Sequence, residues 1–225
     1  MHIEEGLVLG AKLLVGAGTA AAAATYSVKI AIDAVRQQGF ASLALRAGIS
    51  TILVFVFFEV LPTFPVGVSE VHFILGSTLF LILGAAPAAI GLAAGLLIQG
   101  LFFAPFDLPQ YGMNVTTLLV PLFAVRAIAR RIIAPGTAYV DLTYAQALKL
   151  STAYQGGVVA WVAFWALLGQ GFGADNLAAI GSFGLAYMLV IVIEPVADLL
   201  VLAGAKALRG LNGSGLVTPR LHNAA

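Results

Sequence analysis

Long apolar segments dominate this chain and leave room for few architectures. They are continuously apolar, without the alternation that marks a membrane β-strand. They lie at residues 7–28, 41–61, 72–84, 87–104, 114–134, 146–169 and 177–204. Because an α-helix rises about 1.5 Å per residue, about 20 residues cross the hydrocarbon core of a bilayer. The pattern predicts an all-α integral membrane protein, a bundle of about seven transmembrane helices forming a single membrane domain over residues 1–225.

The third segment is too short to span a bilayer upright. A tight turn of sequence Gly-Ala-Ala-Pro at residues 84–87 joins it to the fourth, so we expect a helical hairpin here. Hydrophobic residues make up 61% of the chain and charged residues 9%, which leaves no stretch for a soluble domain. The net charge of +1 gives no indication of nucleic-acid binding.

Basic residues cluster on one side of the expected topology. If the chain crosses seven times, all of them except Lys12 face the same compartment, and the opposite connections carry acids instead. The clustered residues are Lys29, Arg36, Arg46, Arg126, Arg130, Arg131, Lys149, Lys206, Arg209 and Arg220. Positive charge marks the cytoplasmic side. We therefore expect the amino terminus outside, the carboxyl terminus inside, and residues 205–225 as a polar cytoplasmic tail.

His2 stands directly behind the first residue, where it can act as a chelator. The terminal amine, the His2 amide nitrogen and one imidazole nitrogen can close two fused rings around one ion. Nitrogen-rich sites suit nickel, cobalt and copper. The alternative is that His2 is an ordinary residue of a frayed tail. Cysteine is absent, so any metal must be held by nitrogen or oxygen.

His72 lies with His2 on the expected outer face, at the end of a Pro/Gly-punctuated loop over residues 62–72. It is either a metal ligand or an interfacial histidine bonded to a backbone carbonyl, because an unpaired polar group is costly in a membrane. Asn114 opens the fifth segment as a helix N-cap or as the partner that holds a ligating imidazole. Glu59 is expected close to the His72 loop as a second such partner. His222 reads as a solvated residue of the tail.

Three motifs resemble the CbiM/NikM family, the substrate-binding membrane subunits of energy-coupling factor transporters for cobalt and nickel. Residues 1–6 match the family's Met-His-Ile-x-Glu/Asp-Gly start, and residues 65–76 loosely match its Pro/Gly-rich loop that leads to a histidine followed by glycine. Residues 112–114, Gly-Met-Asn, correspond to its Gly-Ala-Asn segment. The chain departs from the pattern at residues 70–71, Glu-Val, where small residues usually precede the histidine, and at residues 117–118.

The resemblance implies that the terminal amine of Met1, the amide and imidazole of His2, and the imidazole of His72 hold the metal. It implies Co2+ or Ni2+ as a transported substrate, with no prosthetic group, in a multi-pass protein of the inner cell membrane. The implied partners are a transmembrane coupling subunit, separate ATPase subunits and, as a further candidate, a small accessory membrane subunit. The chain itself has no GxxxxGK[ST] motif, and we expect no enzymatic activity because no catalytic constellation is present.

Small residues line part of the first segment, and small residues four positions apart allow close helix approach in a bilayer. The resemblance implies that such a surface, including Ala20 and Ala24, docks on the coupling subunit. Packing within the chain is the open alternative.

Two acids in the last segment, Glu194 and Asp198, lie four residues apart and are either functional or paired with Arg126 or Arg130. Two other functions remain open for the whole chain. It could be a vitamin-binding subunit of the same transporter class, or a membrane assembly protein that transports nothing.

Overall fold

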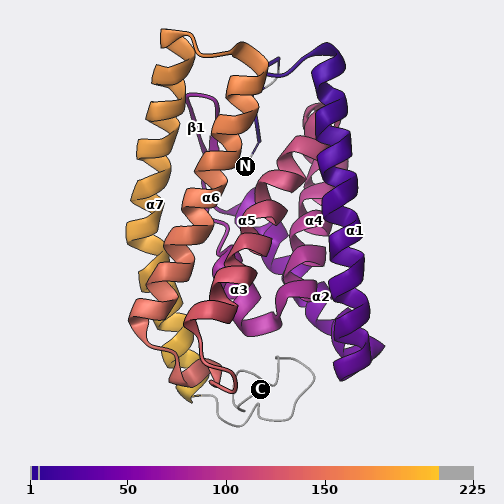
Figure 1. The fold of residues 1–225 in the computed structure, drawn as a ribbon, viewed down its shortest axis with the longest axis vertical. Coiled ribbons are helices and arrows are strands. Elements are labelled where there is room, and N and C mark those ends of the chain that lie inside the picture. The colour runs from indigo at the N-terminus through magenta and orange to yellow at the C-terminus, as the bar shows by residue number, and fades with distance from the viewer. Residues whose placement is uncertain (1, 5, 208–225) are drawn as a thin grey trace.

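A computed structural model describes residues 2–4 and 6–207 of the chain as a bundle of helices with one small hairpin. The α-helices are α1 (Leu13–Gln38), α2 (Phe40–Phe55), α3 (Gly76–Leu83), α4 (Ala85–Phe102), α5 (Tyr111–Ile132), α6 (Tyr144–Gln170) and α7 (Ala174–Ala207). Short helical turns cover Gly10–Lys12, Val56–Val60, Pro105–Gln110 and Tyr139–Asp141. In Figure 1, α1 runs along one side of the bundle and α6 and α7 run along the other.

The expected all-α membrane architecture is confirmed. Among the described residues, five helices are long and apolar enough to cross a membrane. They cover Gly10–Gln38, Phe40–Val60, Ala85–Phe102, Pro105–Ile132 and Tyr144–Gln170. A shorter apolar helix covers Ala174–Val190. At eight residues, α3 is too short to span, and the turn at Gly84 joins it to α4 as a hairpin.

The first, third and last segments differ from the predicted boundaries. α1 begins at Leu13 and continues past residue 28 to Gln38, where Gly39 ends it with a φ of 81° that other residues rarely adopt. The third helix begins at Gly76 instead of residue 72, because the chain before it is extended and Leu75 adopts a left-handed conformation with a φ of 50°. The last helix extends to Ala207, and residues 208–225 of the expected tail lie outside the described part of the structure.

Helices approach closely where glycines face each other or face short side chains. On α5, Gly112 packs against the backbone of Gly16 on α1, at 3.0 Å for an added methyl group. Gly91 on α4 likewise packs against Ser50 on α2. Such contacts gain van der Waals packing in a bilayer, where lipid already satisfies apolar side chains. The small residues of α1 therefore serve internal packing at Gly16.

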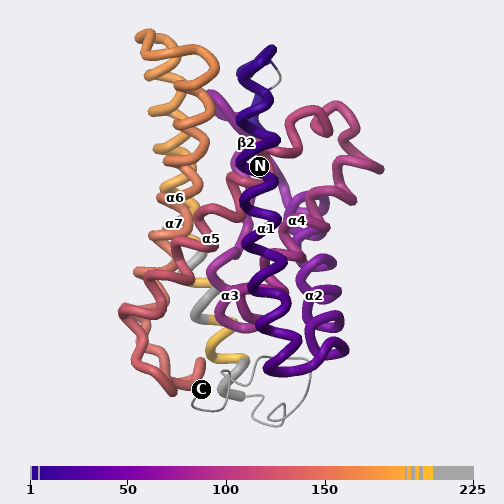
Figure 2. The backbone as a smooth tube through the Cα atoms, turned by 45° about the vertical axis from the view of Figure 1, so that its right-hand side comes forward, coloured from indigo at the N-terminus to yellow at the C-terminus, as the bar shows by residue number. Residues whose placement is uncertain are grey.

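The start of the chain is drawn inward and lies along a β-hairpin. The hairpin pairs β1 (Phe64–Val66) antiparallel with β2 (Ser69–Val71), and Ile3 adds a bridge to Ser69. The Ile3 side chain is 1% exposed, so the amino-terminal segment belongs to the core. Figure 2 shows the amino terminus beside β2, within the width of the bundle.

Candidate metal site

Three side chains converge beside the hairpin: His2 from the amino-terminal segment, Glu70 from β2 and His72 just after it. His2 Nδ1 lies 2.8 Å from Glu70 Oε2, and His72 Nε2 lies 2.9 Å from the same oxygen. One ligand atom from each of the three residues lies within 4.8 Å of the others. The group therefore has the compactness that a single metal ion requires.

Backbone pairing places His2. The His2 carbonyl oxygen accepts hydrogen bonds from the Glu70 amide at 3.1 Å and from Ser69 Oγ at 2.8 Å. The amide of Ile3 donates to Asn114 Oδ1 at 3.0 Å. Because these bonds hold both polar groups of the peptide unit between His2 and Ile3, the main chain next to the imidazole is positioned by β2 and by the first turn of α5.

Strand geometry places the other two. Successive side chains of an extended chain point to opposite faces, so residues two apart share a face. Glu70 and His72 are two apart, and both face His2, with Val71 between them. The hydroxyl of Tyr187 on α7 donates to the His72 carbonyl at 3.2 Å and fixes the chain at this point.

The second nitrogen of His2 faces α4 and the short helical turn Pro105–Gln110. His2 Nε2 lies 2.7 Å from Gln99 Oε1 and 3.6 Å from Asp107 Oδ2. Ligating histidines commonly use their second nitrogen in this way, which fixes the orientation of the ring. The Phe58 ring closes another side, with its centroid 5.0 Å from that of His72 and 6.2 Å from that of His2.

The three residues differ in how far their side chains are exposed to solvent. His2 is 5% exposed and His72 is 2% exposed, whereas the Glu70 side chain is 32% exposed. The carboxylate therefore lies on the solvent side of both imidazoles. Hydrogen bonds from His2 and from His72 lower the pKa of Glu70 below its ordinary range. Burial lowers the pKa of His72 to about 3.

These shifts favour metal binding at neutral pH. An anionic carboxylate and a neutral imidazole are the forms that bind metal ions. A carboxylate only accepts hydrogen bonds, so the protons shared with Glu70 sit on His2 Nδ1 and His72 Nε2. A metal ion would replace those protons. His72 Nδ1 has no hydrogen-bond partner among the described residues.

Some of the predicted site residues are brought together. His2 and His72 meet, with ring centroids 5.3 Å apart. Met1 lies outside the described residues. Asn114 is 1% exposed and contacts the amino-terminal segment, but it lies inside the first turn of α5 and holds the backbone of Ile3, so it is neither an N-cap nor a direct partner of an imidazole.

Glu59 is not brought to the site. It is exposed in the π-helical turn that ends α2, and among the described contacts none joins it to His2 or His72. The residue before it, Phe58, faces the histidines because neighbouring residues of a helical turn point in different directions. The acid that contacts the imidazoles is Glu70.

Glu70 and Gln99 were missed by sequence reasoning, although both left a signal. Glu70 precedes His72 by two positions. If residues 69–72 had been predicted as a strand instead of the start of a helix, this spacing would have placed the two side chains on the same face. Gln99 is the one polar side chain of α4, whose other residues are Ala, Pro, Ile, Gly, Leu and Phe. A lone polar residue in a membrane span is a functional candidate.

The remaining candidates lie elsewhere. Ala20 and Ala24 line an apolar groove of about 580 Å³ between α1, α4 and α5. Ala20 is half-buried and Ala24 is exposed. The side chains of Glu194 and Asp198 lie outside the described part of the structure.

Comparison with known proteins gives two matches. The family profile for CbiM, the cobalt uptake substrate-specific transmembrane region, matches residues 2–210. A crystal structure of a truncated transition metal transporter superposes with a TM-score of 0.67 at 21% sequence identity, over 90% of this chain and 97% of that one. At this identity the likeness shows a common fold. A search of curated proteins found no match.

Proposed function

The chain belongs to the CbiM family of cobalt uptake substrate-specific transmembrane regions, and we propose that it captures Co2+ or Ni2+ at its outer face for ATP-driven uptake. The observation that carries this proposal is the meeting of two buried imidazoles, His2 and His72, whose ring centroids lie 5.3 Å apart. Imidazole suits late transition metals, whereas magnesium and calcium require oxygen ligands and higher coordination numbers.

The chemistry of the chain start would complete the site. The terminal amine of Met1 and the amide nitrogen of His2 are proposed as further donors, next to the His2 imidazole. Each of these groups must lose a proton to bind, so we expect affinity to rise with pH. Gln99 and Asn114 hold the imidazole and the backbone in place, as the contacts at 2.7 and 3.0 Å indicate.

The size of the space beside His2 favours an ion over a vitamin. The pocket there, lined by His2, Asp107, Asn114 and neighbouring side chains, has a cavity volume of about 0 Å³ and so has no room even for a water molecule. Sites for drug-sized organic ligands have volumes of about 300–1,000 Å³. A vitamin would therefore need a rearrangement of the outer loops, whereas an ion that takes the place of the protons shared between His2, Glu70 and His72 would need only small side-chain shifts.

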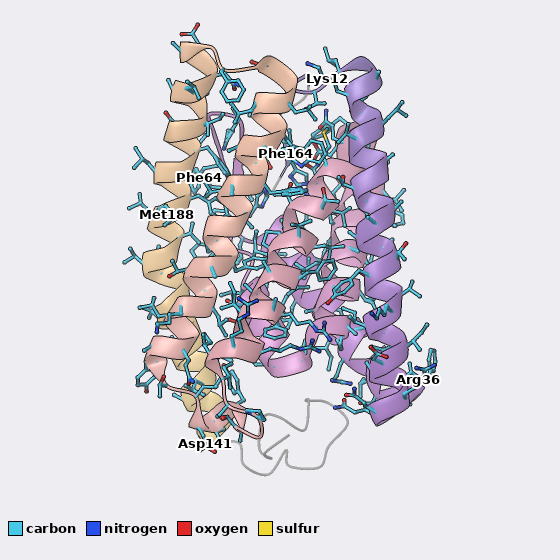
Figure 3. All side chains as sticks on the ribbon, in the orientation of Figure 1. Lys12, Arg36, Phe64, Asp141, Phe164 and Met188 are labelled. Carbon is cyan, nitrogen blue, oxygen red and sulfur yellow. The ribbon has the colours of Figure 1, made fainter. Side chains whose placement is uncertain are left out.

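We place the site on the outside of the inner cell membrane. Arg46, Arg126 and Arg130 surround a polar cavity of about 220 Å³ near the α3–α4 turn. In Figure 3, Lys12 and Arg36 mark the two ends of α1, Lys12 at the top of the view and Arg36 at the bottom. Basic residues favour the cytoplasmic side. The amino terminus would then face outward and the arginine-lined end inward.

Partner chains would supply the energy. We propose a transmembrane coupling subunit, separate ATPase subunits and a small accessory membrane subunit as partners. The coupling subunit would dock on α1 near Ala20 and Ala24, where the groove is apolar and the side chains are small.

The amino terminus provides the test of this function. Full-length protein is purified with a tag at either end, and its bound nickel and cobalt are measured. An amino-terminal tag converts the proposed amine ligand into an amide, so we expect metal to be lost at a cost of several kcal/mol, on the scale of structural metal sites. A carboxyl-terminal tag should leave metal bound. Equal metal content in the two forms would rule out the amino-terminal site.

A further inference from the structure

Glu70 contacts both imidazoles through one oxygen. Glu70 Oε2 lies 2.8 Å from His2 Nδ1 and 2.9 Å from His72 Nε2. The two histidines come from segments 70 positions apart in the sequence, yet they converge on the same atom. The carboxylate oxygen therefore lies between the two imidazoles and contacts both.

Those separations match the coordination sphere of a late transition metal. Metal–nitrogen and metal–oxygen bonds to protein ligands are about 2.0–2.2 Å long. Two ligands at right angles on one ion are then about 2.8–3.1 Å apart, by the same bond lengths. An ion bound by both imidazole nitrogens would therefore have Glu70 Oε2 within bonding reach after a shift of the carboxylate no larger than a bond length.

The charge of Glu70 also supports its role as a metal ligand. The imidazoles of the two nearly buried histidines bring no negative charge to the ion, and a cation in such a place needs compensation. Glu70 carries an anionic carboxylate against both rings, and Asp107 is the next acid, 3.6 Å from His2 Nε2 on the far side of that ring. Because the Glu70 side chain is 32% exposed, it can meet an incoming ion before the histidines do.

We propose that Glu70 is a direct oxygen ligand of the transported ion, bound together with His2 and His72, and that it favours Co2+ relative to Ni2+. This inference rests on the proposed function and adds to it a donor and a preference. A planar set of nitrogens suits nickel, whereas an added carboxylate makes the site a mixed nitrogen–oxygen one with a further ligand, which removes the geometric advantage of nickel.

The test compares carboxyl-terminally tagged wild-type protein with Glu70→Gln, Glu70→Asp and the control Glu4→Gln. Glu4 is an exposed acid of the same amino-terminal segment. Dissociation constants are measured for Co2+ and for Ni2+, and X-ray absorption at each metal edge reports the ligands. We expect Glu70→Gln to weaken Co2+ binding at least about 10-fold and Ni2+ binding less, with one oxygen ligand lost from the cobalt spectrum. Glu70→Asp should retain part of the affinity, and Glu4→Gln all of it.

The outcomes separate the two proposals. Retained nickel binding in Glu70→Gln would show that this variant is folded. Unchanged cobalt affinity and an unchanged spectrum in Glu70→Gln would overturn the role of Glu70 and leave the proposed function standing. Equal losses for both metals would support ligation and overturn the preference. Wild-type protein that binds neither metal would overturn the proposed function, and this inference with it.

Discussion

The amino-terminal site and the groove beside α1 differ in their chemistry, because the site is built from polar groups and the groove from apolar side chains. At the site, side chains from the first residues, the β-hairpin and α4 meet through hydrogen bonds between 2.7 and 2.9 Å. The groove is lined by alanines and aliphatic side chains of α1, α4 and α5, with Ser27 and Tyr111 as its polar contributors. The properties of the site depend on which donor and acceptor atoms are present, and those of the groove depend on the volume of its side chains.

The difference tells which substitutions each region tolerates. At the site, loss of one polar atom leaves a buried partner unpaired or removes a ligand, and either is costly. In the groove, any small apolar side chain serves equally, and only an increase in volume matters. Polar truncations should therefore act on metal binding alone, and enlargements in the groove should act on assembly alone.

The largest effect is expected for His72→Ala. The substitution removes a proposed ligand, so metal affinity should fall by more than the about 10–100-fold typical of losing an outer partner of a ligand. Calorimetry with Ni2+ and Co2+ on carboxyl-terminally tagged protein measures it. His222→Ala replaces the same residue type and should bind as wild type. If His72→Ala bound both metals with wild-type affinity, His72 would not be a ligand.

Asn114→Ala should have a smaller effect. It removes the acceptor that holds the Ile3 amide at 3.0 Å but leaves every proposed ligand in place. We expect metal affinity to fall about 10–100-fold, the range for residues that orient a ligand. The same titration measures it, with Asn114→Asp as the variant that keeps an acceptor oxygen. A loss as severe as that of His72→Ala would indicate a collapsed fold instead of a misplaced ligand.

Ala20→Leu combined with Ala24→Leu tests the groove. Filling the space between α1, α4 and α5 should reduce co-purification with the coupling subunit several-fold, because close helix approach requires small residues. Metal binding by the isolated protein should stay at the wild-type level. Unchanged yield of the complex would assign these alanines to packing within the chain, and a change in metal affinity would break the separation between the two regions.

The smallest effect concerns pH. Burial holds the pKa of His72 at about 3 in the folded chain, below its ordinary 6.5, so between these values the unfolded chain binds the proton more readily. Stability of the metal-free protein is therefore full above about pH 6.5 and declines as the pH falls. The lowered pKa of Glu70 adds to the decline below its ordinary 4.5. The thermal midpoint in detergent should drop by about 2–4 °C per kcal/mol lost, and a rise on acidification would contradict this sign.

The sequence predicted the spans better than the site. Apolar length and charge bias are local properties, and they were enough for a helical membrane bundle, for a short third segment and for a hairpin at residues 84–87. Boundaries were less predictable, since charged residues such as Lys29 and Arg36 continue α1 beyond its apolar part. No local rule placed the extended chain before α3.

The composition of the site needed information that no short window holds. His2 was found by its place directly behind the first residue, and His72 by its place at the end of the Pro/Gly-punctuated loop. Glu59 was chosen by its distance along the sequence, and Glu70 was overlooked, because the choice depended on whether residues 69–72 are strand or helix. The partnership of Ile3 with Asn114 is a tertiary contact across 111 positions, which only the packing of α5 against the hairpin creates.

That long separation also has a consequence in time. During synthesis, His2 and Ile3 are made well before the residues that bind them, which follow 97 and 111 positions later. At about 5–20 residues per second, several seconds to about 20 s pass before the last of those partners has been made. Until then the His2 imidazole lacks Gln99 and the Ile3 amide lacks Asn114, so the proposed ligand exists before the contacts that orient it.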